Sequence, residues 1–167
     1  MKKEVLRTGM ENILELAKIA LEKDGKLAPM AFMRYGGDFE VMPLSFRDND
    51  EKNRQLSLLR RIAMKKNADI VFILTESWYV TSDIDHIDTG HLDIEPSKDP
   101  ARKECILMVG ECEDESITIM QIFDREDGKE NGEIIFGEKI DMREMTSSIF
   151  NFGIKDRKKS KGLRDLN

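Results

Sequence analysis

The residues best suited to chemistry gather in one stretch, TSDIDHIDTGHLDIEPSKDP, which contains both histidines of the chain and a run of carboxylates. Carboxylate oxygens and imidazole nitrogens are the usual ligands of divalent metals. The candidate ligands are Asp83, Asp85, His86, Asp88 and His91. Their spacing fits neither an EF-hand loop, where Ile87 would occupy an acidic position, nor a His-Glu-x-x-His helix. The sequence therefore favours a solvated acidic loop with no metal or other cofactor over a metal site.

A second candidate site flanks this loop. Glu76 and Trp78 end an apolar run before the loop, and Arg102 and Glu104 follow it. If both flanks are strands, alternation places Glu76 on an apolar face, where an unpaired carboxylate would cost several kcal/mol. We predict that Arg102 is its cationic partner. A structural ion pair is the simpler interpretation, and a binding site built from these four residues is the alternative.

The same residues carry a family resemblance. The strand end Glu76-Ser77-Trp78, followed by Pro-Ser-x-Asp-Pro-x-Arg-x-Glu from Pro96 to Glu104, resembles a group of uncharacterised small bacterial and phage-encoded proteins. The similarity covers about residues 69–112. No activity is known for that group, so the resemblance implies kinship but no reaction.

The elements that must position these residues follow from apolar periodicity and turn chemistry. A capping box at Thr8 and Glu11 and a C-cap at Gly25 predict a first helix over residues 9–24. The paired glycines at 36 and 37 predict a hairpin, and an aspartate-rich segment at 48–50 predicts the start of a second helix. The predicted strands are 27–34, 39–46, 69–81, 103–111, 117–123 and 133–140, with a loop at 82–101 and a short helix within 143–154.

This order, α-β-β-α-β-β-β-β, predicts an α+β fold with a mainly antiparallel sheet of five or six strands and two helices on one face. The prolines at 29 and 43 suggest that one hairpin strand is a sheet edge. The topology is similar to that of profilin and roadblock proteins, a likeness that implies no function. We expect one domain over residues 1–154 and a basic tail over 155–167.

Composition limits the classes of function. Hydrophobic residues make up 40% of the chain and charged residues 36%, with a net charge of −6, which is typical of a soluble globular domain. No apolar run is long enough to span a membrane and no signal peptide is recognisable, so we predict a cytoplasmic protein. The acidic body disfavours nucleic-acid binding, for which only the basic tail offers support. Cys105 and Cys112 would lie roughly 23 Å apart on one strand and are predicted to be reduced core thiols.

Two hypotheses of function remain. The first is a non-enzymatic binding or regulatory domain that binds a protein partner or associates with itself, as a homodimer, through a sheet edge or a helix face. The alternative is a small hydrolase or metal-dependent enzyme that uses the loop 83–99 with Glu76 and Glu104. The two differ in whether the carboxylates converge in a concave site or stay dispersed in water.

Overall fold

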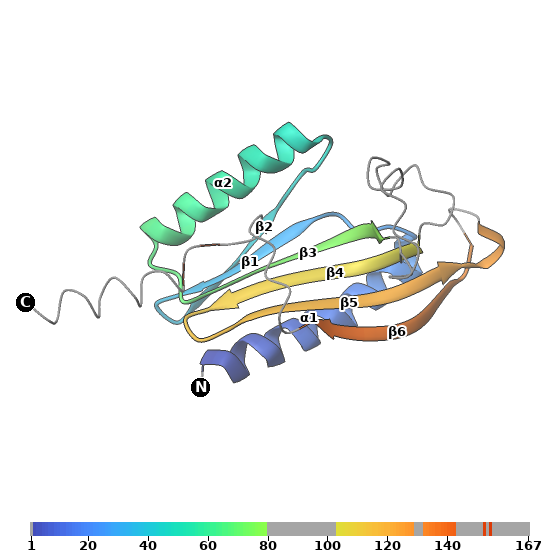
Figure 1. Ribbon diagram of the computed structural model, residues 1–167, viewed down its shortest axis with the longest axis horizontal. Coiled ribbons are helices and arrows are strands. Elements are labelled where there is room, and N and C mark those ends of the chain that lie inside the picture. Colours follow the sequence, from blue (N-terminus) through green and yellow to red (C-terminus); the bar gives the residue numbers. More distant parts are fainter. Residues whose placement is uncertain (1, 80–102, 129–131, 143–151, 153, 155–167) are drawn as a thin grey trace, which may run out of the picture.

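The computed structural model describes residues 2–79, 103–128, 132–142, 152 and 154, and Figure 1 shows their arrangement. The elements are α1 (Lys2–Asp24), β1 (Met30–Tyr35), β2 (Asp38–Pro43), α2 (Asn49–Lys65), β3 (Ile70–Tyr79), β4 (Lys103–Cys112), β5 (Ser116–Arg125), the 3-10 turn η4 (Glu126–Gly128) and β6 (Ile134–Met142). The predicted class and order of helices and strands are confirmed. The predicted loop 82–101, the basic tail 155–167 and most of the predicted C-terminal helix lie outside the described residues.

The strands form a six-stranded sheet in the order β2-β1-β3-β4-β5-β6, and each neighbouring pair is antiparallel. The β1–β2 hairpin closes through Gly36 and Gly37, with φ angles of 53° and 92° that favour glycine. Among the described strands, β2 has a neighbour on one side only, so the predicted edge in the first hairpin is confirmed.

Strand β3 is covered on both faces, as its continuous apolar run predicts. Ile70, Phe72 and Leu74 belong to a core cluster with the apolar stripe of α1, and Val71 and Ile73 belong to a second cluster with α2. The expectation that both helices lie on one face is therefore wrong (Figure 1). The physical reason is strand alternation, because a strand that is apolar at consecutive positions must bury two faces, and each face here needs a helix of its own.

Helix α1 begins at Lys2, not at the capping box predicted around Thr8. Leu6 and Met10 are both fully buried and lie four residues apart, so the apolar stripe that contacts the sheet extends through Thr8 toward the N-terminus. Ion pairs hold this first part of the helix. Arg7 Nη2 lies 3.3 Å from a carboxylate oxygen of Glu115, next to the β4–β5 turn.

Helix α2 begins as predicted. The side chain of Asp48 accepts a hydrogen bond of 2.7 Å from the backbone N–H of Glu51, which is an N-cap contact. Leu56, Leu59 and Ala63 form its buried stripe. The helix is thereby fixed over β1 and β3, with its N-terminal end beside the polar end of β3.

An ion pair anchors the start of β3. Arg34 Nε and Nη2 lie 3.1 Å and 2.6 Å from the two carboxylate oxygens of Asp69, a bidentate arrangement. Partial burial acts to raise the pKa of Asp69. The hydrogen bonds and charge of Arg34 outweigh it, so the pKa lies below its usual value. The Asp69 carboxylate is thus stabilised in its charged form.

A buried carboxylate holds part of the C-terminal segment on the α2 face. Glu111 is 3% exposed and accepts hydrogen bonds from the backbone N–H groups of Phe152, at 2.9 Å, and Ile154, at 2.8 Å. Both of these residues belong to the core cluster that contains α2. These two backbone donors therefore offset the energetic cost of burying the Glu111 side chain.

Cys105 and Cys112 are free and buried, as predicted. The described helices include none long and apolar enough to cross a lipid bilayer. The cytoplasmic location, the two-part division of the chain and the likeness to profilin stay predictions.

Candidate functional site

Three of the four residues predicted to form a binding site lie at one end of the sheet. Glu76 and Trp78 are near the end of β3, and Glu104 is near the start of β4, directly opposite Trp78 in the antiparallel register. Alternation puts all three on the face of the sheet that contacts α1. The fourth residue, Arg102, lies outside the described residues.

Glu76 and Glu104 are joined by an arginine that the sequence analysis missed. Arg125 Nη2 lies 3.0 Å from Glu76 Oε1, and Arg125 Nε lies 3.0 Å from Glu104 Oε2. The Arg125 side chain is 7% exposed, whereas those of Glu76 and Glu104 are 19% and 24% exposed. Among the described residues, the cation that meets Glu76 is therefore Arg125, and the predicted pairing with Arg102 stays a prediction.

The end of α1 completes this network. Gly25 ends the helix with a φ of 72°, and its N–H donates to Leu21 O at 2.8 Å. Arg125 Nη1 donates to Gly25 O at 2.7 Å, and Leu27 N–H donates to Glu76 Oε2 at 3.1 Å. The network of Arg125, Glu76 and Glu104 thus connects three strands to the chain reversal after α1.

A sequence signal for Arg125 does exist. Phe123 is buried in the core cluster beneath α1, and Arg125 follows it by two residues on the same strand face. An arginine on an apolar strand face requires a carboxylate, and Glu76 was already predicted to lie on an apolar face and to need a cation. The predicted strand ended at residue 123, which left Arg125 outside the strand. The observed strand ends at Arg125.

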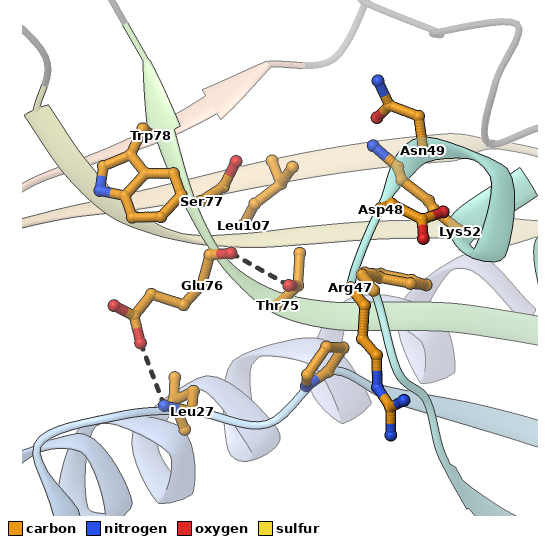
Figure 2. Close-up of a pocket in the computed structure, with 12 residues that line it drawn as sticks. Leu27, Arg47, Asp48, Asn49, Lys52, Thr75, Glu76, Ser77, Trp78 and Leu107 are labelled. Atoms are coloured by element: carbon orange, nitrogen blue, oxygen red, sulfur yellow. Dashed lines mark hydrogen bonds between the residues drawn. The ribbon is translucent and has the colours of Figure 1, made fainter. Parts of the chain in front are cut away.

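Glu76 and Trp78 also line a cavity of about 820 Å³ between the end of β3 and the N-terminal end of α2. Its described lining residues are Leu27, Pro29, Phe46, Arg47, Asp48, Asn49, Lys52, Thr75, Glu76, Ser77, Trp78 and Leu107. Figure 2 shows Trp78 and Glu76 on one side of this cavity, with Asn49 and Lys52 across from them. Ser77 and Leu107 lie between the two sides (Figure 2).

The lining of the cavity contains both carboxylates and cations. Its carboxylates are held by other groups of the protein, because Asp48 caps α2 and Glu76 accepts from Leu27 and Arg125. Its cations are Arg47 and Lys52, beside the first turn of α2, where helix amides contribute partial positive charge.

Thiol chemistry is disfavoured near the network. Burial, with a further contribution from the charge of Glu76, raises the pKa of the Cys105 thiol to about 12. Cys105 thus stays protonated at neutral pH and is a poor nucleophile. The part of the chain that the structure describes contains no group of three or more His, Cys, Asp or Glu side chains able to hold a metal. The candidate ligands at 83–91 lie outside the described residues, so the metal hypothesis is neither supported nor weakened.

The geometry defines an α+β sheet domain with a ligand-sized cavity and a buried ionic network. Comparison of the chain with models of protein families, with curated proteins and with solved structures finds no match to any of them. The resemblance to small bacterial and phage-encoded proteins therefore stays a prediction.

Proposed function

We propose that this chain is a binding domain whose ligand occupies the cavity between β3 and the N-terminal end of α2. The observation that carries the proposal is that Glu76 and Trp78, selected from the sequence as binding residues, both line this cavity. A volume of about 820 Å³ falls within the range of pockets that enclose a small organic molecule.

The lining favours a ligand with an apolar body and an anionic group. Phe46, Pro29 and Leu107, on the sheet face that α2 covers, offer apolar and aromatic surface for the body. Arg47 and Lys52 supply positive charge near the start of α2. The cavity carboxylates are hydrogen-bonded within the protein, which reduces their repulsion of an anion.

A fluorescent aromatic anion, anilinonaphthalene sulfonate, tests this proposal. Trp78 is the only tryptophan in the chain, so energy transfer from it reports a probe bound near the cavity. We expect saturable binding and weaker binding of neutral anilinonaphthalene. The Lys52→Met variant should lower affinity about fivefold, since a charge pair near a protein surface contributes on the order of 1 kcal/mol or more.

The matched control is Lys65→Met, which removes the same charge from the other end of α2, outside the lining of this cavity. It should leave probe affinity unchanged. Equal weakening in the two variants would show that the probe responds to overall charge, and the proposal would fail. Absence of saturable energy transfer from Trp78 would also reject it.

A further inference from the structure

The outer edge of β2 presents backbone groups that have no strand beside them in the described structure. Leu44 N–H donates to Pro29 O at 2.8 Å, so this pair is a hydrogen-bonded pair of the β1–β2 ladder. In an antiparallel ladder such pairs alternate with pairs that do not exchange hydrogen bonds. The amide and carbonyl groups of Phe39 and Val41, and the carbonyl of Pro43, therefore point away from β1.

A second contact supports this assignment. Arg34 lies opposite Phe39 in the hairpin, and its carbonyl accepts from Asp69 N–H at 2.9 Å, on the β3 side of β1. The backbone of Arg34 is thus directed to β3 and not to β2. Phe39 must then direct its own backbone groups to the outside of the sheet.

The side chains of the same residues are exposed and apolar. Phe39 is 52% exposed and Val41 is 51% exposed, both on the sheet face that α1 partly covers. The Phe39 ring lies 6.4 Å from that of Phe32, so it contacts the aromatic part of the core while half of it stays exposed. An edge strand that combines outward-pointing backbone groups with exposed apolar side chains is a template for pairing with another strand.

We infer that the occupant of this edge is β2 of a second copy of the chain, paired antiparallel about a twofold axis, with Val41 opposite Val41 of the second copy. This register forms hydrogen bonds between the two valines. It also lets each Phe39 N–H donate to the carbonyl of Pro43 in the other copy. The missing N–H of Pro43 removes only a donor at the end of the ladder.

Charge selects this register over its neighbour. If Val41 stood opposite Phe39 of the second copy, the two Glu40 side chains would face each other directly, and like charges in that position are destabilising. With Val41 opposite Val41, each Glu40 faces the apolar Met42 instead. Each Glu40 also keeps its ion pair with Lys66. The self-association is independent of the ligand proposed for the cavity.

Mass measurement by light scattering on the full chain tests the dimer. We expect twice the 19.3 kDa of one chain. The Val41→Lys variant should have the mass of one chain, because its ammonium groups would meet at the axis. The matched control is Ile135→Lys on β6, the other edge of the described sheet, where the side chain is 57% exposed. A single-chain mass for the unmodified protein, or a dimer unchanged by Val41→Lys, would overturn the proposal.

Disulfide trapping tests the register. Facing residues of a hydrogen-bonded antiparallel pair have Cα atoms about 5.5 Å apart, within reach of a disulfide. The Val41→Cys variant should therefore form a covalent dimer under mild oxidation. The Phe39→Cys variant should not, since its thiols would stand apart along the strands. Cys105 and Cys112 are buried, so the unmodified protein, which contains only these two thiols, gives the background level of covalent dimer. More efficient linking through position 39 than through position 41 would refute the register.

Discussion

Replacement of Arg125 by methionine is the sharpest test of the buried ionic network. Methionine keeps an unbranched apolar stem but removes the guanidinium that contacts Glu76, Glu104 and the carbonyl of Gly25. Two carboxylates would then lose the cation that joins them in the described structure, at a site where each is less than a quarter exposed. The folded variant should therefore lose the attraction between the guanidinium and the two carboxylates, while the cost of desolvating these carboxylates remains.

Removal of one partner from a buried ion pair costs about 3–5 kcal/mol. Because water reaches part of Glu76 and Glu104, we expect a loss near the lower end, about 3 kcal/mol in the free energy of unfolding. The control is Lys139→Met, which breaks an ion pair with Glu11 whose side chains are 42% and 46% exposed. Solvent screening at that site limits the loss to about 0.5 kcal/mol.

Urea unfolding, followed by Trp78 fluorescence and by circular dichroism, measures both variants. A second step separates charge from packing. Addition of Glu76→Gln to Arg125→Met should recover part of the lost stability, because it removes one stranded charge. If Arg125→Met costs no more than Lys139→Met, the network is a screened surface feature and the argument is refuted. No recovery in the double variant would show that the loss does not come from the stranded charge of Glu76.

The other predictions concern the core and the Asp69 ion pair. Phe72→Ala should cost about 3–5 kcal/mol in urea unfolding, because Phe72 is fully buried at the centre of the sheet; a loss under about 1 kcal/mol would contradict the packing. Gly110→Ala should be destabilising by about 1–3 kcal/mol, since the added Cβ would lie 2.7 Å from Met10 Sδ and 3.0 Å from Phe72 Cβ; unchanged stability would show that α1 shifts freely. The Asp69→Asn variant should be less stable than the native chain at neutral pH. Because the folded-state pKa of Asp69 is lowered, its stabilisation is present above its unfolded pKa of about 3.9 and disappears as the pH falls through the folded value. The melting temperatures of the native chain and of the Asp69→Asn variant should therefore converge as the pH falls through that range. A difference in stability that persists in acid would show that the Asp69 carboxylate is not the source of the difference.

Local signals in the sequence were sufficient to predict most elements of the fold. The diglycine turn, the cap at Asp48 and the apolar run from Ile70 to Leu74 each depend on residues close together in the chain. The first helix begins earlier than predicted. The prediction was wrong because Thr8 and Glu11 match a capping motif but lie inside a longer amphipathic stripe. A cap motif restricts a helix start only where the apolar periodicity also stops there.

The placement of the helices was a different problem, because it depends on long-range packing. The continuous apolar run of β3 is typical of a strand covered on both faces, whereas both helices were predicted to lie on one face. Phe72 and Val71 contact different helices, so the alternation within β3 already contained the answer. Consistent use of that alternation would have placed α1 and α2 on opposite sides.

The candidate site combines a feature that was predicted with one that was missed. A need for a cation near Glu76 followed from its position on an apolar face. The identity of that cation depended on the register of β4 against β5, which brings Arg125 close to Glu104. No spacing along the chain encodes this register, since the polar turn between the strands could close in several ways.

The position of Glu76 links the ionic network to the cavity. One carboxylate oxygen contacts Arg125 and the other accepts the N–H of Leu27, which lines the cavity together with Pro29. The side chain thus fixes the segment after α1 against the end of β3, where Trp78 stands. In the proposed binding domain, Glu76 acts by positioning the cavity wall, because both of its oxygens are already engaged by the protein. The cations that would attract an anionic ligand come from the opposite side, at the start of α2, so stability and ligand charge recognition depend on different residues around the same cavity.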